Sequence, residues 1–128
     1  PIPHLTRAPS RRYVQHMRYI DREALKSYLD RGEPLHLVET LQPKEFAKGH
    51  LPGAVNIPFT RMTREARERF SPEDVIVVYC HDENCKASLR AAEKLEKLGY
   101  TNVFEYSGGK HDWEAAGLPF EYDTDTEK

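Results

Sequence analysis

"VIVVYCHDENCKASLRAAEKLEKLGYTNVFEY", which runs from Val75 to Tyr106, is the stretch that decides the fold. Its first five residues are apolar or aromatic without alternation, which predicts a strand that is buried on both faces. From Ala87 onward, apolar residues recur at helical spacing as far as Gly99, and a second apolar run follows. A strand, a helix and another strand in this order predict a parallel sheet with a crossover helix.

The rest of the chain alternates in the same way between short apolar runs and segments with helical features. This alternation predicts the α/β class, with a parallel sheet that is covered by helices on both faces. The other expected elements are a helix from Asp21 to Gly32, a strand at Leu35–Val38, a brief helix from Pro43 to Gly49, a strand at "AVNIP" (54–58), a charged helix from Thr63 to Phe70 and a last short helix at "KHDWEAAG" (110–117).

The two ends of the chain differ from the middle in composition. Residues 1–16 contain prolines and arginines with little periodicity, and we expect them to form a flexible arm. Residues 123–128 ("DTDTEK") are expected to form a polar tail. A single α/β domain is therefore predicted over residues 17–122.

Composition limits the possible partners and locations. The chain has 128 residues and a net charge of −2, which gives no electrostatic reason to expect binding to nucleic acid or to an anionic membrane. No apolar run approaches the roughly 18 residues of a membrane span. Two cysteines do not make a disulfide framework, so we expect a reducing, cytoplasmic setting. We also expect a monomer.

Cys80 stands at the junction between the predicted central strand and the helix that follows. In parallel sheets, binding crevices form beyond the carboxyl ends of the strands. A loop there can turn its backbone N–H groups inward, and the helix N-terminus adds partial positive charge. Both features stabilise a thiolate, which is the nucleophilic form of cysteine. The junction therefore indicates a nucleophilic Cys80 whose charge is held by main-chain amides.

Two other interpretations of the cysteines stay open on the residues alone. A free cysteine often serves as a small buried packing residue. Cys80 and Cys85 could also bind zinc together with histidines such as His81 or His111, although their spacing matches no standard pair of zinc ligands.

Four separated stretches resemble a rhodanese-type domain: "EFAKGHLPGAVNIP", "VIVVYCHDENCKAS", "AAEKLEKLGYTNVFEYSGG" and "WEAAGLP". The resemblance covers residues 17–119 and implies about five mostly parallel strands between helices. It also implies a sulfurtransferase whose cysteine takes sulfane sulfur from a donor as a persulfide and passes it to a nucleophile. Cys80 occupies that position. Such transfer needs no metal and no organic cofactor.

The resemblance assigns the active-site loop to the residues that follow Cys80. Their backbone is expected to hold the persulfide, and Lys86 is the nearest side-chain charge. Asp82 and Glu83 make the loop a poor match for the dianion thiosulfate, so we expect a small sulfur donor or a persulfidated protein to supply sulfur to a thiol acceptor. The predicted loop residues are His81, Asp82, Glu83, Asn84, Cys85, Lys86, Ala87 and Ser88.

Departures from the family pattern keep alternatives open. Typical members have Asp–x–Arg after the first strand, whereas this chain has Glu39, Thr40 and Leu41, so an ion pair that braces the region is expected to be lost. This loss favours an inactive regulatory or protein-binding module. The loop is longer than usual, as in rhodanese-fold phosphatases, but Lys86 stands where their arginine would lie. A phosphatase or arsenate-reductase-like activity is the remaining alternative.

Cys85 is a third departure, because it lies inside the loop. It is either a small packing residue or a resolving thiol that attacks a persulfide on Cys80, releases the sulfur and leaves a disulfide. We interpret His50 as structural, bonded to loop backbone, and Glu45 as bonded to backbone or to an arginine. Trp113 is expected to pack the last helix onto the sheet.

Overall fold

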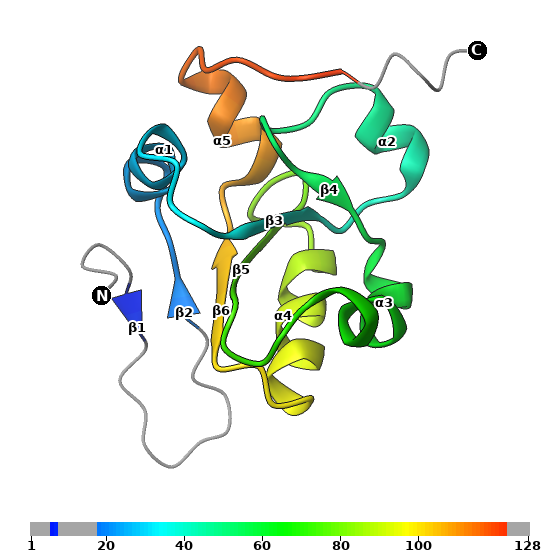
Figure 1. The fold of residues 1–128 in the computed structure, drawn as a ribbon. Coiled ribbons are helices and arrows are strands. Elements are labelled where there is room, and N and C mark those ends of the chain that lie inside the picture. Colours follow the sequence, from blue (N-terminus) through cyan, green and yellow to red (C-terminus); the bar gives the residue numbers. More distant parts are fainter. Residues whose placement is uncertain (1–5, 8–17, 123–128) are drawn as a thin grey trace.

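The computed structural model describes residues 6–7 and 18–122, which form a six-stranded sheet with helices on both faces (Figure 1). No helix in this part of the chain has the length and apolar character that crossing a bilayer requires. The elements are β1 (Thr6–Arg7), β2 (Arg18–Tyr19), α1 (Arg22–Asp30), β3 (His36–Glu39), α2 (Pro43–Ala47), β4 (Val55–Asn56), the 3₁₀ helix η1 (Phe59–Arg61), α3 (Met62–Arg69), β5 (Val75–Tyr79), α4 (Ala87–Lys97), β6 (Asn102–Tyr106) and α5 (Gly109–Ala115).

The strand order is β1-β2-β6-β5-β3-β4, and the last five strands in this order pair in parallel. The predicted α/β class with about five mostly parallel strands is therefore confirmed. β1 adds an antiparallel edge strand that the sequence did not predict. Its residues, Thr6–Arg7, lie inside the expected N-terminal arm and pair with β2. The other residues of that arm below residue 17, and the expected tail at 123–128, lie outside the described residues.

β5 is a central strand, and its side chains belong to two separate hydrophobic cores, one on each face of the sheet. Ile76 and Val78 belong to the core under α3 and α4, whereas Val77 and Tyr79 belong to the core under α1 and α5. All four side chains are fully buried. The absence of alternation in the sequence therefore corresponds to a strand that is covered on both faces.

The helix ends follow the expected local chemistry. The Asp21 side chain caps α1 by accepting a hydrogen bond from the Ala24 N–H at 2.8 Å. Gly32 takes a positive φ of 68° just after the helix.

The predicted strand at Leu35–Val38 is shifted by one residue to His36–Glu39, which places Glu39 within the sheet.

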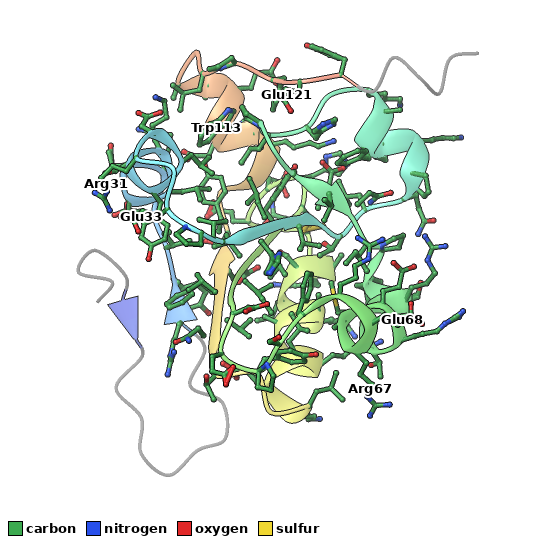
Figure 2. The ribbon with its side chains drawn as sticks, in the orientation of Figure 1. Arg31, Glu33, Arg67, Glu68, Trp113 and Glu121 are labelled. Carbon is green, nitrogen blue, oxygen red and sulfur yellow. A yellow bond between two sulfur atoms is a disulfide. The ribbon has the colours of Figure 1, made fainter. Side chains whose placement is uncertain are left out.

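Trp113 packs α5 onto the sheet, as predicted (Figure 2). It is 1% exposed and meets the Tyr106 ring edge-on, with 6.3 Å between ring centroids. The Trp113 indole N–H donates to the Pro119 carbonyl at 2.8 Å, so the polar tip of the side chain is also satisfied.

The start of α5 lies directly against the end of β5. The Lys110 N–H donates to the Cys80 carbonyl at 3.0 Å, and the His111 N–H donates to the His81 carbonyl at 2.8 Å. Gly109, with a φ of +63°, makes this approach possible. A Cβ at Gly109 would overlap the Cys80 carbonyl oxygen and lie 2.8 Å from the His81 carbonyl.

We expect Gly109→Ala to lower the free energy of unfolding by about 2–5 kcal/mol, because the positive φ and the backbone overlap both disfavour a methyl group. Gly117→Ala is the matched control, since Gly117 has a φ of +74° but no atom within 4 Å of the added Cβ. That control is expected to lose only about 1–2 kcal/mol. Urea denaturation measures both values. Equal losses in the two variants would contradict the role assigned to the close approach.

Candidate active site

The predicted active-site loop connects β5 to α4, and its shape depends on Asp82. The Cys85 N–H donates to the Asp82 carbonyl at 3.1 Å, and the Asn84 N–H donates to the Asp82 side chain at 3.0 Å. These bonds make a turn that returns the chain toward Cys80. Two of the amides expected to hold an anion therefore bond within the loop instead.

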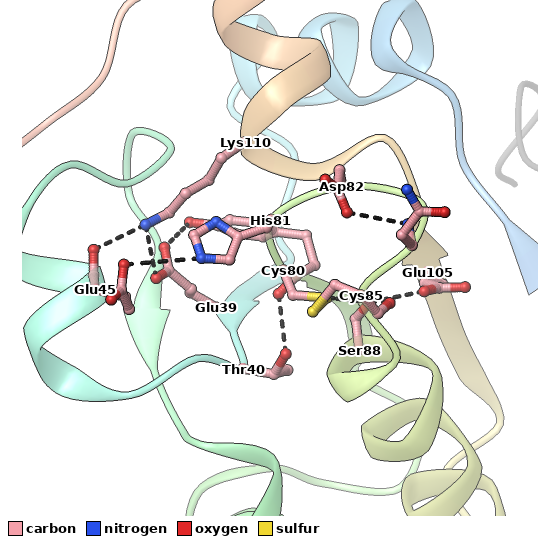
Figure 3. Close-up of a disulfide and its surroundings, with 12 residues drawn as sticks. Glu39, Thr40, Glu45, Cys80, His81, Asp82, Cys85, Ser88, Glu105 and Lys110 are labelled. Atoms are coloured by element: carbon pink, nitrogen blue, oxygen red, sulfur yellow. Dashed lines mark hydrogen bonds and ion pairs between the residues drawn. A yellow bond between two sulfur atoms is a disulfide. The ribbon is translucent and has the colours of Figure 1, made fainter.

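Cys80 and Cys85 form a disulfide across this turn (Figure 3). Their Cα atoms are 6.4 Å apart, a separation that a disulfide can span. The pairing answers the question that the sequence left open, whether the curled loop brings the two sulfurs together. Within the described residues, no group of three or more His, Cys, Asp and Glu side chains is arranged to hold a metal ion.

A chain of buried polar groups leads from the Cys80 sulfur into the sheet. The Cys80 Sγ lies 3.2 Å from the Ser88 Oγ, in the first turn of α4. The Ser88 hydroxyl in turn donates to the Glu105 Oε2 on β6 at 2.7 Å. Burial raises the pKa of Glu105 above its ordinary range, while the Ser88 hydrogen bond opposes that rise.

Glu105 was missed at the level of sequence. Its signal is a lone acidic residue in an otherwise apolar and aromatic strand, "NVFEY". Ser88 was predicted as part of the loop backbone, and the structure adds a contact of its side chain with Cys80. Both residues are buried, with 1% of Ser88 and 5% of Glu105 exposed.

A second buried carboxylate, Glu39, lies on the other side of Cys80 at the end of β3. The Tyr79 hydroxyl donates to one Glu39 oxygen at 2.9 Å. The Lys110 Nζ lies 2.9 Å from the other oxygen (Figure 3). Lys110 also donates to the Glu45 carbonyl at 2.8 Å. Burial raises the pKa of Glu39, whereas Lys110 and Tyr79 act in the opposite direction.

The Glu39–Lys110 pair corrects one expectation. The sequence has Leu41 where family members carry an arginine, and the loss of a bracing ion pair was predicted. The structure shows that a cation reaches Glu39 from α5 instead. The brace is therefore present, and the Leu41 position gives no reason to expect a loose site.

The loop residue His81 and its neighbours Glu45 and His50 have distinct surroundings. The exposed His81 ring faces the Glu45 carboxylate, with 3.8 Å between Nε2 and Oε1. The prediction that Glu45 bonds to backbone or to an arginine is therefore wrong, since its side chain faces His81 and Lys48. His50 is structural as predicted, but its backbone partner lies in α2 and not in a loop: its Nδ1 lies 3.1 Å from the Phe46 carbonyl and its ring stacks on Phe46.

Two open grooves lie beside the loop, and Cys80 lines neither of them. One groove, here called the α5 groove, is lined by Glu45, Lys48, Gly49, His81, Asp82, Lys110, His111, Glu114, Phe120 and Tyr122. The other, here called the Cys85 groove, is lined by Tyr19, Glu83, Cys85, Lys86, Leu89, Glu105 and Ser107.

Comparison with known proteins identifies the family. Residues 21–116 match the rhodanese-like domain, and the chain belongs to that family. The solved structure of BH2092 from Bacillus halodurans superimposes with a TM-score of 0.76 and 28% identity, covering 81% of this chain and 76% of that one. A protein named sulfurtransferase from Allochromatium vinosum is 33% identical over 100 residues, which are 78% of this chain and 91% of that protein.

Another relative is considerably longer than the matched region. The putative sulfur carrier protein YrkF of Bacillus subtilis is 32% identical over 94 residues, which are 73% of this chain. The chain spans only 49% of the length of YrkF.

We expect Lys110→Met to lower the free energy of unfolding by about 3 kcal/mol at pH 7, because the buried Glu39 carboxylate loses its cation. Burial raises the pKa of Glu39, so its ionisation lowers stability as the pH rises from the ordinary carboxyl pKa to the raised one, and removal of the lysine widens that range. The loss should therefore be smaller at pH 4, where more Glu39 is protonated. Urea denaturation at both pH values measures the difference.

Lys48→Met is the control for Lys110→Met, since the Lys48 side chain is exposed and lies 3.7 Å from the Glu45 carboxylate. Its effect should stay within about 0.5 kcal/mol. A loss in Lys110→Met that is the same at pH 4 and pH 7 would contradict the role of the Glu39 charge.

We expect Glu105→Gln to speed the alkylation of Cys80 by iodoacetamide at pH 7 by about three- to tenfold, measured in reduced protein that also carries Cys85→Ser. The change removes a negative charge near the thiolate. An amide at this position can also donate to the Ser88 oxygen, which frees the Ser88 proton to bond to the sulfur. Glu93→Gln, on the exposed face of α4, is the control with the same change of charge. A slower or unchanged rate in Glu105→Gln would refute the coupling.

Proposed function

We propose that this chain is a rhodanese-type sulfurtransferase in which Cys80 accepts sulfane sulfur as a persulfide and passes it to a thiol or another nucleophile. The observation that carries the proposal is the position of Cys80, just beyond the carboxyl end of β5 and 3.2 Å from the Ser88 hydroxyl at the start of α4. Relatives that are named a sulfurtransferase and a putative sulfur carrier protein support the same chemistry.

The proposed step begins with the reduced form of the site. The Cys80 thiolate attacks the outer sulfur of the donor, and with thiosulfate the sulfur–sulfur bond breaks and sulfite leaves with the electron pair. The N-terminus of α4 favours the thiolate before attack and the anionic persulfide afterwards. The cysteine carries the transferred sulfur itself, so the step uses no metal or organic cofactor.

The charged side chains of the loop affect which class of sulfur donor can approach Cys80. Glu83 is exposed on the loop, and Asp82 lines the α5 groove while its carboxylate accepts the Asn84 N–H. This acidic rim disfavours a free dianion and favours a less charged donor, such as a persulfide on a protein or a small thiol. A thiol acceptor, a monomeric state and a cytoplasmic setting complete the proposal.

The test is the intact mass of reduced Cys85→Ser protein after brief exposure to thiosulfate, to 3-mercaptopyruvate or to a small-molecule persulfide. One added sulfur atom is expected, because Cys85→Ser holds the persulfide on Cys80. The double variant Cys80→Ser/Cys85→Ser should gain none. No added sulfur from any of the three donors would contradict the proposal, and alkylation of Cys80 in the same samples would then indicate a reactive thiol with another role.

A further inference from the structure

We propose that Cys85 releases the sulfur carried by Cys80 as sulfide, which gives the domain a second activity: the thiol-driven reduction of sulfane sulfur. The inference rests on the proposed persulfide on Cys80. In this step the Cys85 thiolate attacks the inner sulfur of the persulfide, which is the Cys80 Sγ. The bond to the outer sulfur breaks, and hydrosulfide leaves with the bonding electron pair. The product is the Cys80–Cys85 disulfide.

The structure holds the product of this step, since Cys80 and Cys85 are bonded to each other. The turn at Asp82 brings the two residues together, and the backbone around Cys80 is fixed by the Lys110 N–H at 3.0 Å. Attack on the inner sulfur therefore needs no rearrangement of the elements on either side. An intramolecular thiol in this position acts at a far higher effective concentration than a thiol in solution.

Cys85 is more accessible to solvent than Cys80. This difference determines which sulfur of the disulfide an external thiolate attacks. Cys80 is 1% exposed and lines neither groove, whereas Cys85 is partly exposed and lines the Cys85 groove together with Lys86 and Leu89. An external thiolate therefore reaches the Cys85 sulfur first. Cys80 is then the leaving group, and the N-terminus of α4 favours its thiolate form.

The reductant that fits this cycle is a dithiol. Its first thiolate attacks Cys85 and forms a mixed disulfide while the Cys80 thiolate leaves. Its second thiol then closes the reductant's own disulfide, and Cys85 returns to the thiol state. With thiosulfate as donor, thiosulfate and the dithiol become sulfite, hydrosulfide, one proton and the oxidised reductant, and the protein is regenerated.

The Cys85 groove has the surroundings that this chemistry needs. The exposed Lys86 places a cation in the groove that Cys85 lines, and a cation favours the thiolate that attacks the persulfide. Tyr19 and Leu89 supply apolar walls for the carbon skeleton of a dithiol. The Cys85 groove is therefore where an external dithiol meets the Cys80–Cys85 disulfide.

The test is a single turnover without a reductant. Reduced wild-type protein, freed of reductant, is mixed with excess thiosulfate, and sulfite, sulfide and intact mass are measured. One sulfite and one sulfide per chain are expected, together with a protein mass that is lower than the reduced mass by two hydrogens. Cys85→Ser should release sulfite and keep the added sulfur, with sulfide release slowed by about tenfold or more. Cys85→Ala repeats the test without a hydroxyl in place of the thiol.

A second experiment distinguishes failure of the resolving role from failure of the proposed sulfurtransferase activity. Cyanide is added to persulfidated Cys85→Ser, and thiocyanate should form, because Cys80 still hands its sulfur to an external nucleophile. If Cys85→Ser releases sulfide as fast as the wild type, or if wild-type protein carries the added sulfur on Cys85, the resolving role is overturned while the sulfurtransferase stands. If thiosulfate, 3-mercaptopyruvate and the small-molecule persulfide all add no sulfur to Cys80 in either protein, both proposals fail.

Discussion

Three successive carbonyl groups at the end of β5 determine how the active-site loop is held. The Tyr79 carbonyl accepts hydrogen bonds from the Thr40 N–H and hydroxyl, and the next two carbonyls accept the Lys110 and His111 N–H groups. Buried backbone carbonyls that lack partners are strongly disfavoured, so the residue after β3 and the start of α5 together fix the chain where the sheet ends. Cys80 is the middle residue of this segment, and its side chain has little freedom to move.

Two buried carboxylates, Glu39 and Glu105, lie beside this segment. Their hydrogen-bond and ion-pair partners differ, so one is expected to affect stability and the other the reactivity of Cys80. Burial raises the pKa of both Glu39 and Glu105. Glu39 has a cation at 2.9 Å and a tyrosine hydroxyl, so its charge is neutralised and it acts as a brace between β3 and α5. The direct partner of Glu105 is the Ser88 hydroxyl, which also lies against the Cys80 sulfur. The protonation state of Glu105 is thus expected to affect the reactivity of the thiol, whereas that of Glu39 is expected to affect stability.

The features that could be predicted from sequence are those that local patterns encode. A strand buried on both faces has no alternation, and α4 repeats its apolar residues at helical spacing, so β5, Cys80 and α4 were placed correctly. The Glu39–Lys110 pair joins the first half of the domain to its last helix, and no local pattern reports such a contact. Glu105 approaches Cys80 because parallel pairing sets it opposite Val78, a register that periodicity cannot supply. β1 has only two residues, too few to show a period.

In the proposed reaction, burial of Cys80 limits which acceptors could take its sulfur. A side chain that is 1% exposed and absent from both grooves is shielded from a bulky thiol, so an acceptor must either enter as a small nucleophile or belong to the loop itself. The turn at Asp82 places Cys85 on the boundary between the buried sulfur and the open groove. The loop holds a cysteine that is bonded to the buried Cys80 and is itself partly exposed. In the proposed cycle, this position joins sulfur transfer to thiol–disulfide exchange within one short segment of chain.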